Sequence, residues 1–277
     1  MERNSTDYFF YSNNYTETIV CLLGIFGFVG NMFVVVVIIK CPALHTCSNY
    51  LTASLAIVDL TSSVVMMFNM TNSALLVVMV YLTFASLAHL LAISVDKYLL
   101  ITRPFSYHTS NKKVFISICL AWTIPFITLV NPKMLIITVC ANGFAVSWIM
   151  VFSQIFSLLT YFTIIAINVR MYIIARKQSR QINAIATGQP RQMETYSASW
   201  KATKTTIIVI GAFSTSSAPT FTITFLFSLC CEMRNIMSYL WYPLLSINPI
   251  LNPVIYTIRR HEFQNAARNV IRTLKMC

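Results

Sequence analysis

Seven long apolar runs constrain the fold of this chain more than any other feature of its sequence. They occupy residues 17–39, 50–69, 73–95, 114–131, 144–175, 203–229 and 236–257. A helix of about 20 apolar residues crosses the hydrocarbon core of a bilayer, and each run is close to that length or longer. With 57% hydrophobic and 10% charged residues, the chain has too little polar surface to cover a water-soluble globule. The sequence therefore predicts an all-α membrane protein with a bundle of seven transmembrane helices.

The basic residues predict the orientation of this bundle. If the N-terminus lies outside the cell, only Arg3, Lys133 and Arg234 of the 20 Lys and Arg residues fall on the outer side. Because Lys and Arg concentrate in cytoplasmic loops, we expect a multi-pass protein of the plasma membrane with an extracellular N-terminus. The net charge of +12 then reflects this bias and an attraction to anionic membrane lipids, so no nucleic-acid partner is needed.

Three regions follow from the hydropathy pattern. They are an extracellular tail at 1–16, a seven-transmembrane domain at 17–258, and an amphipathic surface helix with the C-terminal tail at 259–277. The last region repeats Phe263, Ala267 and Val270 at helical spacing between Arg and Lys, which is typical of a helix on the inner membrane surface. The first region has N-glycosylation triplets at Asn4 and Asn14. Its polar start is not typical of a cleaved signal peptide.

The cysteines predict one covalent link and one lipid anchor. Cys140, Cys230 and Cys231 fall on the oxidising exterior, so Cys140 can pair with either of the other two. Cys277 follows a basic amphipathic stretch and is a candidate for palmitoylation, the alternative being a free thiol. No CxxC pair or His/Cys cluster has the spacing of metal ligands, so a transition-metal site is not expected.

One acidic residue, Asp59, lies in the middle of an apolar run. An ionisable group in the hydrocarbon costs roughly 2.5–3.5 kcal/mol on insertion scales, so its presence marks a functional candidate. Ser86, Asn248 and Asn252 fall at similar depth in other runs, as does Asn31. Carboxylate, hydroxyl and amide oxygens suit hard cations. The sequence therefore predicts a Na⁺ ion, the one cofactor expected, held by Asp59, Ser86, Asn248 and Asn252. The alternative is a neutral carboxyl that is hydrogen-bonded to a neighbouring helix.

The sequence contains no recognisable catalytic motif. It has no nucleophile elbow, no HExxH and no phosphate-binding loop, so the chain is not expected to be an enzyme. It also lacks the paired Gly/Pro-interrupted segments that are typical of inverted-repeat transporters. A transporter or an ion pathway centred on Asp59 nevertheless stays open as an alternative.

Short motifs in successive runs together resemble those of one family. In chain order they are Gly30-Asn31 with Val34, Leu55-Ala56 with Asp59, Asp96-Lys97-Tyr98, Trp122 with Pro125, Phe213 with Pro219, and Asn252-Pro253-Val254-Ile255-Tyr256. This series resembles the helix motifs of the rhodopsin-like (class A) G-protein-coupled receptors, from the first helix to the surface helix. The resemblance implies a receptor that switches between two packings and passes an extracellular ligand signal to a heterotrimeric G protein.

The resemblance also implies roles for residues at the inner end of the bundle. In the family, the acid of the third-helix motif holds its basic neighbour until activation frees it. Asp96 would accordingly restrain Lys97, and Phe105 would enter a groove of the G protein. Tyr98 and Tyr256 belong to the two inner motifs that are assigned to coupling. The alternative is that Asp96 and Lys97 only mark the point where a helix leaves the membrane.

Several residues depart from the pattern of the family. Lys97 stands in place of an arginine and offers a point charge rather than a planar fork of donors. Ser217 replaces the sixth-helix tryptophan, and Thr160 and Asn168 replace the fifth-helix proline and tyrosine. Asn72 stands where a disulfide cysteine is expected. The missing disulfide, the missing fifth-helix proline and a short second outer loop together resemble the melanocortin-like branch. A receptor-like protein that does not signal is therefore a further alternative.

The ligand pocket of the family lies between the outer halves of helices three, five, six and seven. The residues that fall there are Met79, Thr83, Phe152, Phe156, Ser217, Phe221, Phe225, Tyr242 and Ser246. Met79 stands where amine receptors have an aspartate, and Ser246 stands where opsins have a lysine. A biogenic amine and retinal are therefore not expected. The expected ligand is a small neutral molecule, a lipid-like molecule or a short peptide.

Overall fold

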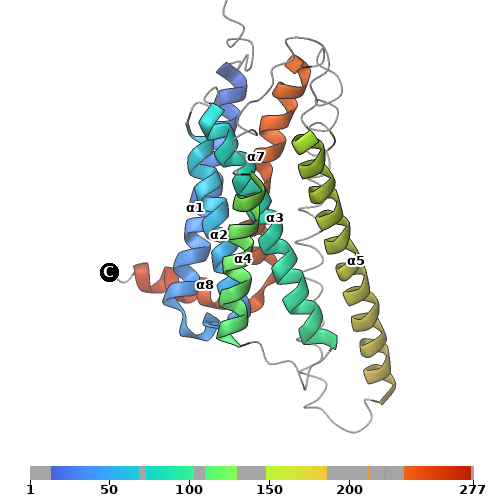
Figure 1. Ribbon diagram of the computed structural model, residues 1–277. Helices are drawn as coiled ribbons and strands as arrows, with labels where there is room; N and C mark the ends of the chain where they lie inside the picture. The colour runs from blue at the N-terminus through green and yellow to red at the C-terminus, as the bar shows by residue number, and fades with distance from the viewer. Residues whose placement is uncertain are drawn as a thin grey trace, which may run out of the picture.

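A computed structural model of the chain describes residues 14–68, 73–102, 110–129, 148–185, 211, 222 and 234–275. The described part is built from helices (Figure 1). They are α1 (Asn14–Lys40), the 3-10 turn η1 (Pro42–Leu44), α2 (Cys47–Met66), α3 (Ser73–Thr102), α4 (Asn111–Leu129), α5 (Trp148–Ile185), α7 (Arg234–Arg259) and α8 (His261–Lys275). Six of the seven apolar runs therefore coincide with a helix, and the run at 203–229 falls outside the described residues except for positions 211 and 222.

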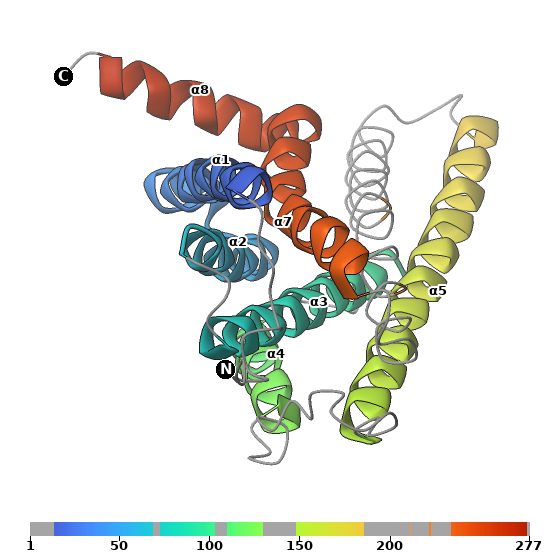
Figure 2. The same ribbon diagram turned by 90° about the horizontal axis from the view of Figure 1, so that it is seen from above.

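The helices form a bundle in which α3 contacts three other described helices. It packs against α2, α4 and α5, while α1 packs against α2 and α7, and α7 also touches α2 (Figure 2). α8 turns away from the end of α7 and lies against α1 and η1. Residues far apart in sequence on α2, α3 and α7 are thereby brought together.

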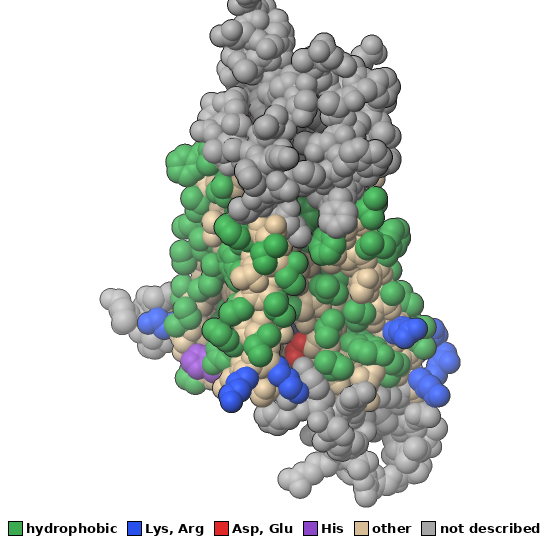
Figure 3. All heavy atoms as spheres, viewed as in Figure 1, with side chains coloured by type: hydrophobic (Ala, Val, Ile, Leu, Met, Phe, Trp, Pro, Cys, Tyr) green, Lys and Arg blue, Asp and Glu red, His purple; other side chains and the backbone are tan. Residues whose placement is uncertain are grey.

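The surface of the bundle suits a membrane. Within the described residues, four helical segments are long and apolar enough to cross a bilayer: Tyr15–Lys40, Cys47–Met66, Val78–Thr102 and Ile155–Lys177. Phe26, Phe126 and Phe162 are each more than half exposed, and such a surface would be unfavourable in water. Exposed Lys and Arg residues gather toward one end of the bundle, where α1 ends and α4 begins (Figure 3). The outward faces are therefore lipid-facing, with a basic rim at one end.

Glycines allow α1 to lie close to α2 and α7. A Cβ atom placed on Gly27 would overlap Oγ of Ser63 on α2, and one on Gly30 would lie 2.8 Å from Cγ of Pro253 on α7. Small residues at such positions let helix backbones approach closely. Because lipid tails are as apolar as the side chains, helices in a membrane associate through this close packing rather than through the hydrophobic effect. The contact of α1 with both neighbours thus depends on the absence of these side chains.

A chain of buried hydrogen bonds joins α2, α3 and α4. Trp122 Nε1 donates to Ser54 Oγ at 3.1 Å, and Ser54 Oγ lies 2.8 Å from Nε2 of His89, which is fully buried. Nδ1 of His89 lies 2.7 Å from the Ala85 carbonyl. Because a carbonyl only accepts, Nδ1 carries the hydrogen, and Nε2 accepts from Ser54. Tyr81 adds a second α3–α4 bond by donating to the Trp122 carbonyl at 3.0 Å.

The ends of some helices differ from the hydropathy boundaries. α1 begins at Asn14, three residues inside the predicted 1–16 tail. α5 continues to Ile185, beyond the apolar run at 144–175. Hydropathy marks the thickness of the hydrocarbon rather than the end of a helix. The Lys, Arg and Gln residues after Ala175 are good helix formers, so the helix continues beyond the apolar run.

The predicted surface helix is present as α8. Phe263, Ala266, Ala267 and Val270 are buried, while Arg268 and Arg272 are exposed. Phe263 meets Phe33 of α1 edge to face with ring centroids 6.2 Å apart. α8 is therefore held to α1 by its apolar face and presents its basic face outward, as expected of a helix on a membrane surface.

Candidate functional site

Asp59 lies in the interior of the bundle, where it joins three helices. Its side chain on α2 is 1% exposed. Oδ1 accepts a hydrogen bond from Ser86 Oγ of α3 at 3.3 Å, and Oδ2 accepts one from Asn252 Nδ2 of α7 at 2.6 Å. Each carboxylate oxygen thus has a donor from a different helix, so the position of α7 relative to α2 and α3 is tied to this one side chain.

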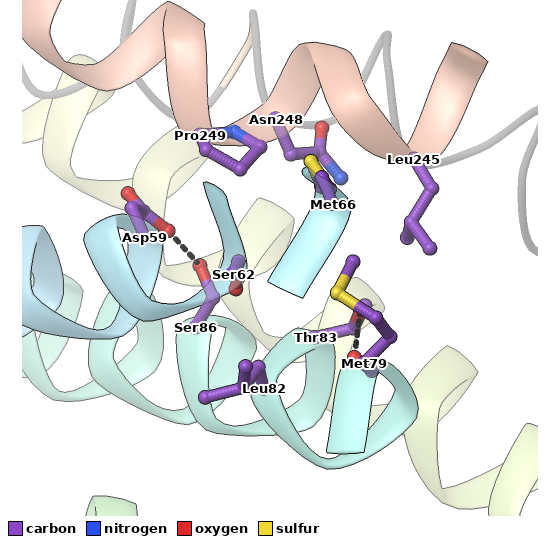
Figure 4. A pocket seen from close by; sticks show the side chains of 10 residues that line it. All are labelled: Asp59, Ser62, Met66, Met79, Leu82, Thr83, Ser86, Leu245, Asn248 and Pro249. Carbon is purple, nitrogen blue, oxygen red and sulfur yellow. Dashed lines mark hydrogen bonds between the residues drawn. The ribbon is translucent and has the colours of Figure 1, made fainter. Parts of the chain in front are cut away.

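A small cavity lies next to Asp59 (Figure 4). Its lining comes from α2, α3 and α7 and comprises Asp59, Ser62, Met66, Met79, Leu82, Thr83, Ser86, Leu245, Asn248 and Pro249. The cavity has a volume of about 10 Å³, which is close to the room that a single water molecule needs. Three of the four residues predicted to hold Na⁺ therefore line one cavity. Asn252 bonds to Asp59 but is not part of the lining.

The lining residues fit a hard monovalent cation. The Asp59 carboxylate supplies negative charge, and the Ser86 hydroxyl keeps its lone pairs because it acts as a donor to Asp59. Ser62 likewise donates to the Val58 carbonyl at 3.0 Å and keeps its lone pairs. The polar groups of these three side chains are all oxygens, which suit a hard cation rather than a soft metal.

Asn31 plays a different part from that of the cavity residues. Its Nδ2 donates to the Gly27 carbonyl at 2.9 Å and to the Pro249 carbonyl on α7 at 2.7 Å. Although Asn31 lies at a depth similar to that of Asp59, no hydrogen bond joins these two described side chains. Asn31 instead fastens α1 to the backbone of α7.

The residues expected in the ligand pocket fall into different surroundings. Met79, which is 1% exposed, and Thr83 line the same cavity as Asp59, so this wall of the expected pocket is continuous with the cation site. Ser246 is buried and Phe156 is exposed. The side chains of Phe152 and Tyr242, and the residues Ser217, Phe221 and Phe225, lie outside the described part of the chain.

At the inner end of α3, Asp96 has a partner that the motif does not predict. Ser48 Oγ at the start of α2 donates to Asp96 Oδ2 at 2.9 Å, and Asp96 is 5% exposed. Among the described residues, Asp96, Arg260 and Glu262 are charged groups that act electrostatically on the Lys97 ammonium, and Arg260 and Glu262 belong to the junction of α7 and α8. The acid and the base of the motif therefore connect α3 to different parts of the bundle.

The other residues assigned to coupling are placed in part. Tyr256 is buried, and Cζ of Arg260 lies 6.0 Å from the centroid of its ring. Tyr98 is half-buried, and Phe105 lies outside the described residues. Sequence reasoning missed the participation of Ser48, Arg260 and Glu262. The only signal for them was their position at the ends of helices that meet at the same membrane face.

Several further predictions fall outside the described residues and stay predictions. They concern Asn4, Cys140, Cys230, Cys231 and Cys277. Asn14 is the first residue of α1.

Asn168, which stands at the place of the fifth-helix tyrosine, is buried and donates to the Ile164 carbonyl at 2.7 Å and to Ser94 Oγ of α3 at 3.4 Å. It therefore links α5 to α3.

Comparison with known proteins agrees with these motifs. A family model described as "7 transmembrane receptor (rhodopsin family)" matches residues 30–256. Lysophosphatidic acid receptor 3 of Mus musculus is 26% identical over 300 residues, which cover 95% of this chain and 84% of the relative. Lysophosphatidic acid receptor 1 of Homo sapiens is 26% identical over 272 residues, covering 89% of this chain and 73% of the relative.

A third relative has another ligand class in its name. Trace amine-associated receptor 4 of Mus musculus is 25% identical over 288 residues, covering 87% of this chain and 80% of the relative. The family match runs from the first-helix motif to the tyrosine of the seventh-helix motif and covers most of the chain. The predicted all-α seven-transmembrane architecture is thereby confirmed. The chain belongs to the rhodopsin family of seven-transmembrane G-protein-coupled receptors.

Proposed function

We propose that this receptor passes an extracellular ligand signal to a heterotrimeric G protein and that Asp59 lies at the centre of its switch. The observation that carries this proposal is the simultaneous bonding of Asp59 to Ser86 of α3 and Asn252 of α7. Members of the family are receptors rather than enzymes. An ion pathway or a receptor-like protein that does not signal is not favoured by the family match.

The geometry supports a two-state site. A Na⁺ ion beside Asp59 would compete with the Asn252 amide, because both supply positive charge to the same carboxylate. The direct Asn252–Asp59 bond draws α7 toward α2, whereas a bound cation would share the carboxylate among its own oxygen ligands. A cation that binds one packing more tightly than the other shifts the equilibrium between the two packings. That is the property a receptor needs.

The proposed location is the plasma membrane, with the N-terminus outside. Exposed Lys40, Lys112, Lys113, Arg176 and Lys177 lie on the same side of the membrane as the connection between α1 and α2. Because such residues concentrate on the cytoplasmic face, this end of the bundle is the one that would meet the G protein. Lys97 and Tyr256 lie toward this end.

We expect Lys97→Ala to lower nucleotide exchange on purified heterotrimeric G proteins by about tenfold. The ammonium is the one basic group of the third-helix motif, and a charge-assisted contact is worth roughly 1.5–3 kcal/mol, where each 1.4 kcal/mol is a factor of ten. The measurement is GTP-analogue binding by a panel of G proteins with receptor reconstituted in lipid.

The matched variant is Lys97→Arg, which restores the residue usual in the family. It should exchange at least as fast as the natural chain, because a guanidinium offers five donors in a fixed fork. Equal exchange by the natural chain and Lys97→Ala would contradict the proposed role of Lys97. No exchange on any G protein, with any of the lipids named below, would contradict the proposed signalling function.

We propose a neutral lipid-like ligand. The outer part of α3, from Ser73 to Leu91, contains no Asp, Glu, Lys or Arg, so it offers neither an anion for an amine nor a cation for a phosphate. Two of the relatives are named for a lysophospholipid and one for amines. Met79 and Leu82 of α3 are buried apolar side chains that offer no partner to a charged group, and buried charges without partners would be costly.

The test compares lipids that share one acyl chain. The monoacylglycerol concentration that stimulates nucleotide exchange should be at least about tenfold lower than that of lysophosphatidic acid. Lysophosphatidic acid carries a phosphate that would lose its water without gaining a basic partner on α3, whereas a monoacylglycerol carries none. A preference for lysophosphatidic acid that is lost on replacing Lys133 and Arg234, the outer-side basic residues beyond the tail, would overturn the neutral-ligand proposal while leaving the receptor assignment intact.

A further inference from the structure

α7 contains three prolines, at positions 243, 249 and 253. A proline inside a helix cannot donate to the carbonyl four residues earlier, and its ring pushes that carbonyl aside. In a membrane the freed carbonyl needs a partner from inside the protein, because lipid supplies no hydrogen-bond donor. Each proline of α7 therefore raises the question of which group satisfies the carbonyl that it frees.

The carbonyl freed by Pro253 has a partner in this structure. It belongs to Pro249 and accepts a hydrogen bond from Asn31 Nδ2 of α1 at 2.7 Å. Pro253 itself fits against Gly30 of α1. A side chain from a neighbouring helix thus restores the lost bond, as the membrane environment demands.

The carbonyl freed by Pro249 belongs to Leu245, which lines the cavity of Asp59. Leu245 is 5% exposed and lies on the α7 wall together with Asn248 and Pro249 (Figure 4). Among the residues that the structure describes, no side chain donates a hydrogen bond to Leu245. Leu245 therefore lines a cavity that also contains the Asp59 carboxylate, and no described side chain replaces the hydrogen bond that its carbonyl loses to Pro249.

We propose that the backbone carbonyl of Leu245, freed by Pro249, is a ligand of the Asp59 cation site. This inference rests on the proposed Na⁺ binding and adds a ligand that side-chain motifs do not reveal. Backbone carbonyls of interrupted transporter helices bind Na⁺, and those of channel filter loops bind K⁺, because their dipoles replace water without adding charge. The site then has oxygen ligands from three helices: the carboxylate from α2, the hydroxyl of Ser86 from α3, and this carbonyl from α7.

This ligand couples the ion to the shape of α7. The Leu245 carbonyl is available to the ion only while the helix is interrupted at Pro249. A bound cation therefore favours the kinked form of α7, and the site loses this ligand when the helix is straight. Pro249 is therefore a positioning residue for the site, and it acts through the backbone rather than through its own side chain.

The test is the Na⁺ dependence of thermal stability in the purified full-length receptor. The melting temperature is measured in NaCl against N-methyl-D-glucamine chloride at constant ionic strength. Pro249→Ala restores an N–H that bonds to the Leu245 carbonyl, and the Na⁺ concentration for half of the stabilisation should rise on the order of tenfold. Pro243→Ala is the matched control, because it removes a proline of the same helix outside the cavity lining, and its half-point should not change.

A backbone variant separates the carbonyl from the proline. An α-hydroxy acid with a serine side chain at position 246 turns the Leu245 amide into an ester, whose carbonyl is a weaker ligand, and Pro249 stays in place. The Na⁺ half-point should again rise several-fold. If Na⁺ stabilises the natural chain but not Asp59→Asn, and Pro249→Ala and the ester leave the half-point unchanged, the proposal about Leu245 is overturned. No Na⁺ effect on the natural chain would overturn the cation site itself.

Discussion

Gly27→Ala should lower the melting temperature of the purified receptor by several degrees. The new methyl group would overlap Ser63 Oγ, which is buried and donates to the Asp59 carbonyl at 2.7 Å. Overpacking a tight interface costs about 1–3 kcal/mol, which exceeds the roughly 0.5–1 kcal/mol that alanine gains over glycine in a helix. Differential scanning fluorimetry of detergent-solubilised receptor, together with the yield of monodisperse protein, measures the effect.

A second substitution should rescue this variant. Without Oγ at position 63, the nearest atoms to the new methyl group are the Cβ atoms of residues 63 and 249, at 3.4 Å and 3.5 Å, which is ordinary contact. Gly27→Ala with Ser63→Ala should therefore melt close to Ser63→Ala alone. Gly211→Ala is the neutral comparison, since no atom of the described residues lies within 4 Å of the position that its methyl group would take. An unchanged melting temperature in Gly27→Ala would show that α1 and α2 are not in close contact there.

Asp59→Asn should make the stability of the receptor independent of Na⁺. Asparagine keeps the shape of the side chain and can still accept from Ser86, but it lacks the charge that attracts a cation. A ligand present at about a hundred times its dissociation constant stabilises the folded state by about 2.7 kcal/mol. This whole increment should vanish in the variant. The measurement is the melting temperature over a NaCl series at constant ionic strength.

Asp96→Asn is the matched control for that experiment. Asp96 is also a buried aspartate that accepts from a serine hydroxyl, but its partner is Ser48, and it is not part of the cavity lining. The Na⁺-dependent increment should survive in this variant. A Na⁺ effect that persists in Asp59→Asn would mean that the ion binds elsewhere, and the cation site at Asp59 would have to be abandoned.

The sequence predicts the helices of this protein better than their orientation about their own axes. On α1, Val29 is 60% exposed and Val34 is completely buried, although the two residues are identical. In a membrane, lipid and protein interior are equally apolar, so hydrophobic periodicity does not tell one face from the other. What does mark the inner face is polarity, as for Asp59 and Ser86, or small size, as for Gly27.

Partners of polar groups were harder to predict than their presence. Asp59 and Ser86 were expected to meet, and they do. The Ser48–Asp96 bond was not expected, because it depends on the exact height at which α2 begins after η1. The bond from Asn31 to the Pro249 carbonyl was not expected for another reason. Every residue has a backbone carbonyl, so no residue type in the sequence identifies the one that needs a partner. Such backbone effects follow from the positions of prolines only once neighbouring helices are placed.

The hydrogen-bond chain from Trp122 through Ser54 and His89 to Ala85 runs in one direction, with every hydrogen assigned. Sliding α2 or α4 along α3 would leave a buried donor without an acceptor, at about 1–3 kcal/mol for each one. α2, α3 and α4 therefore act as a fixed reference frame. Asp59 and Ser86 belong to that frame, so the wall that they form for the ion does not move with α7. A signal that crosses the membrane is then a movement of α7 relative to α2, α3 and α4.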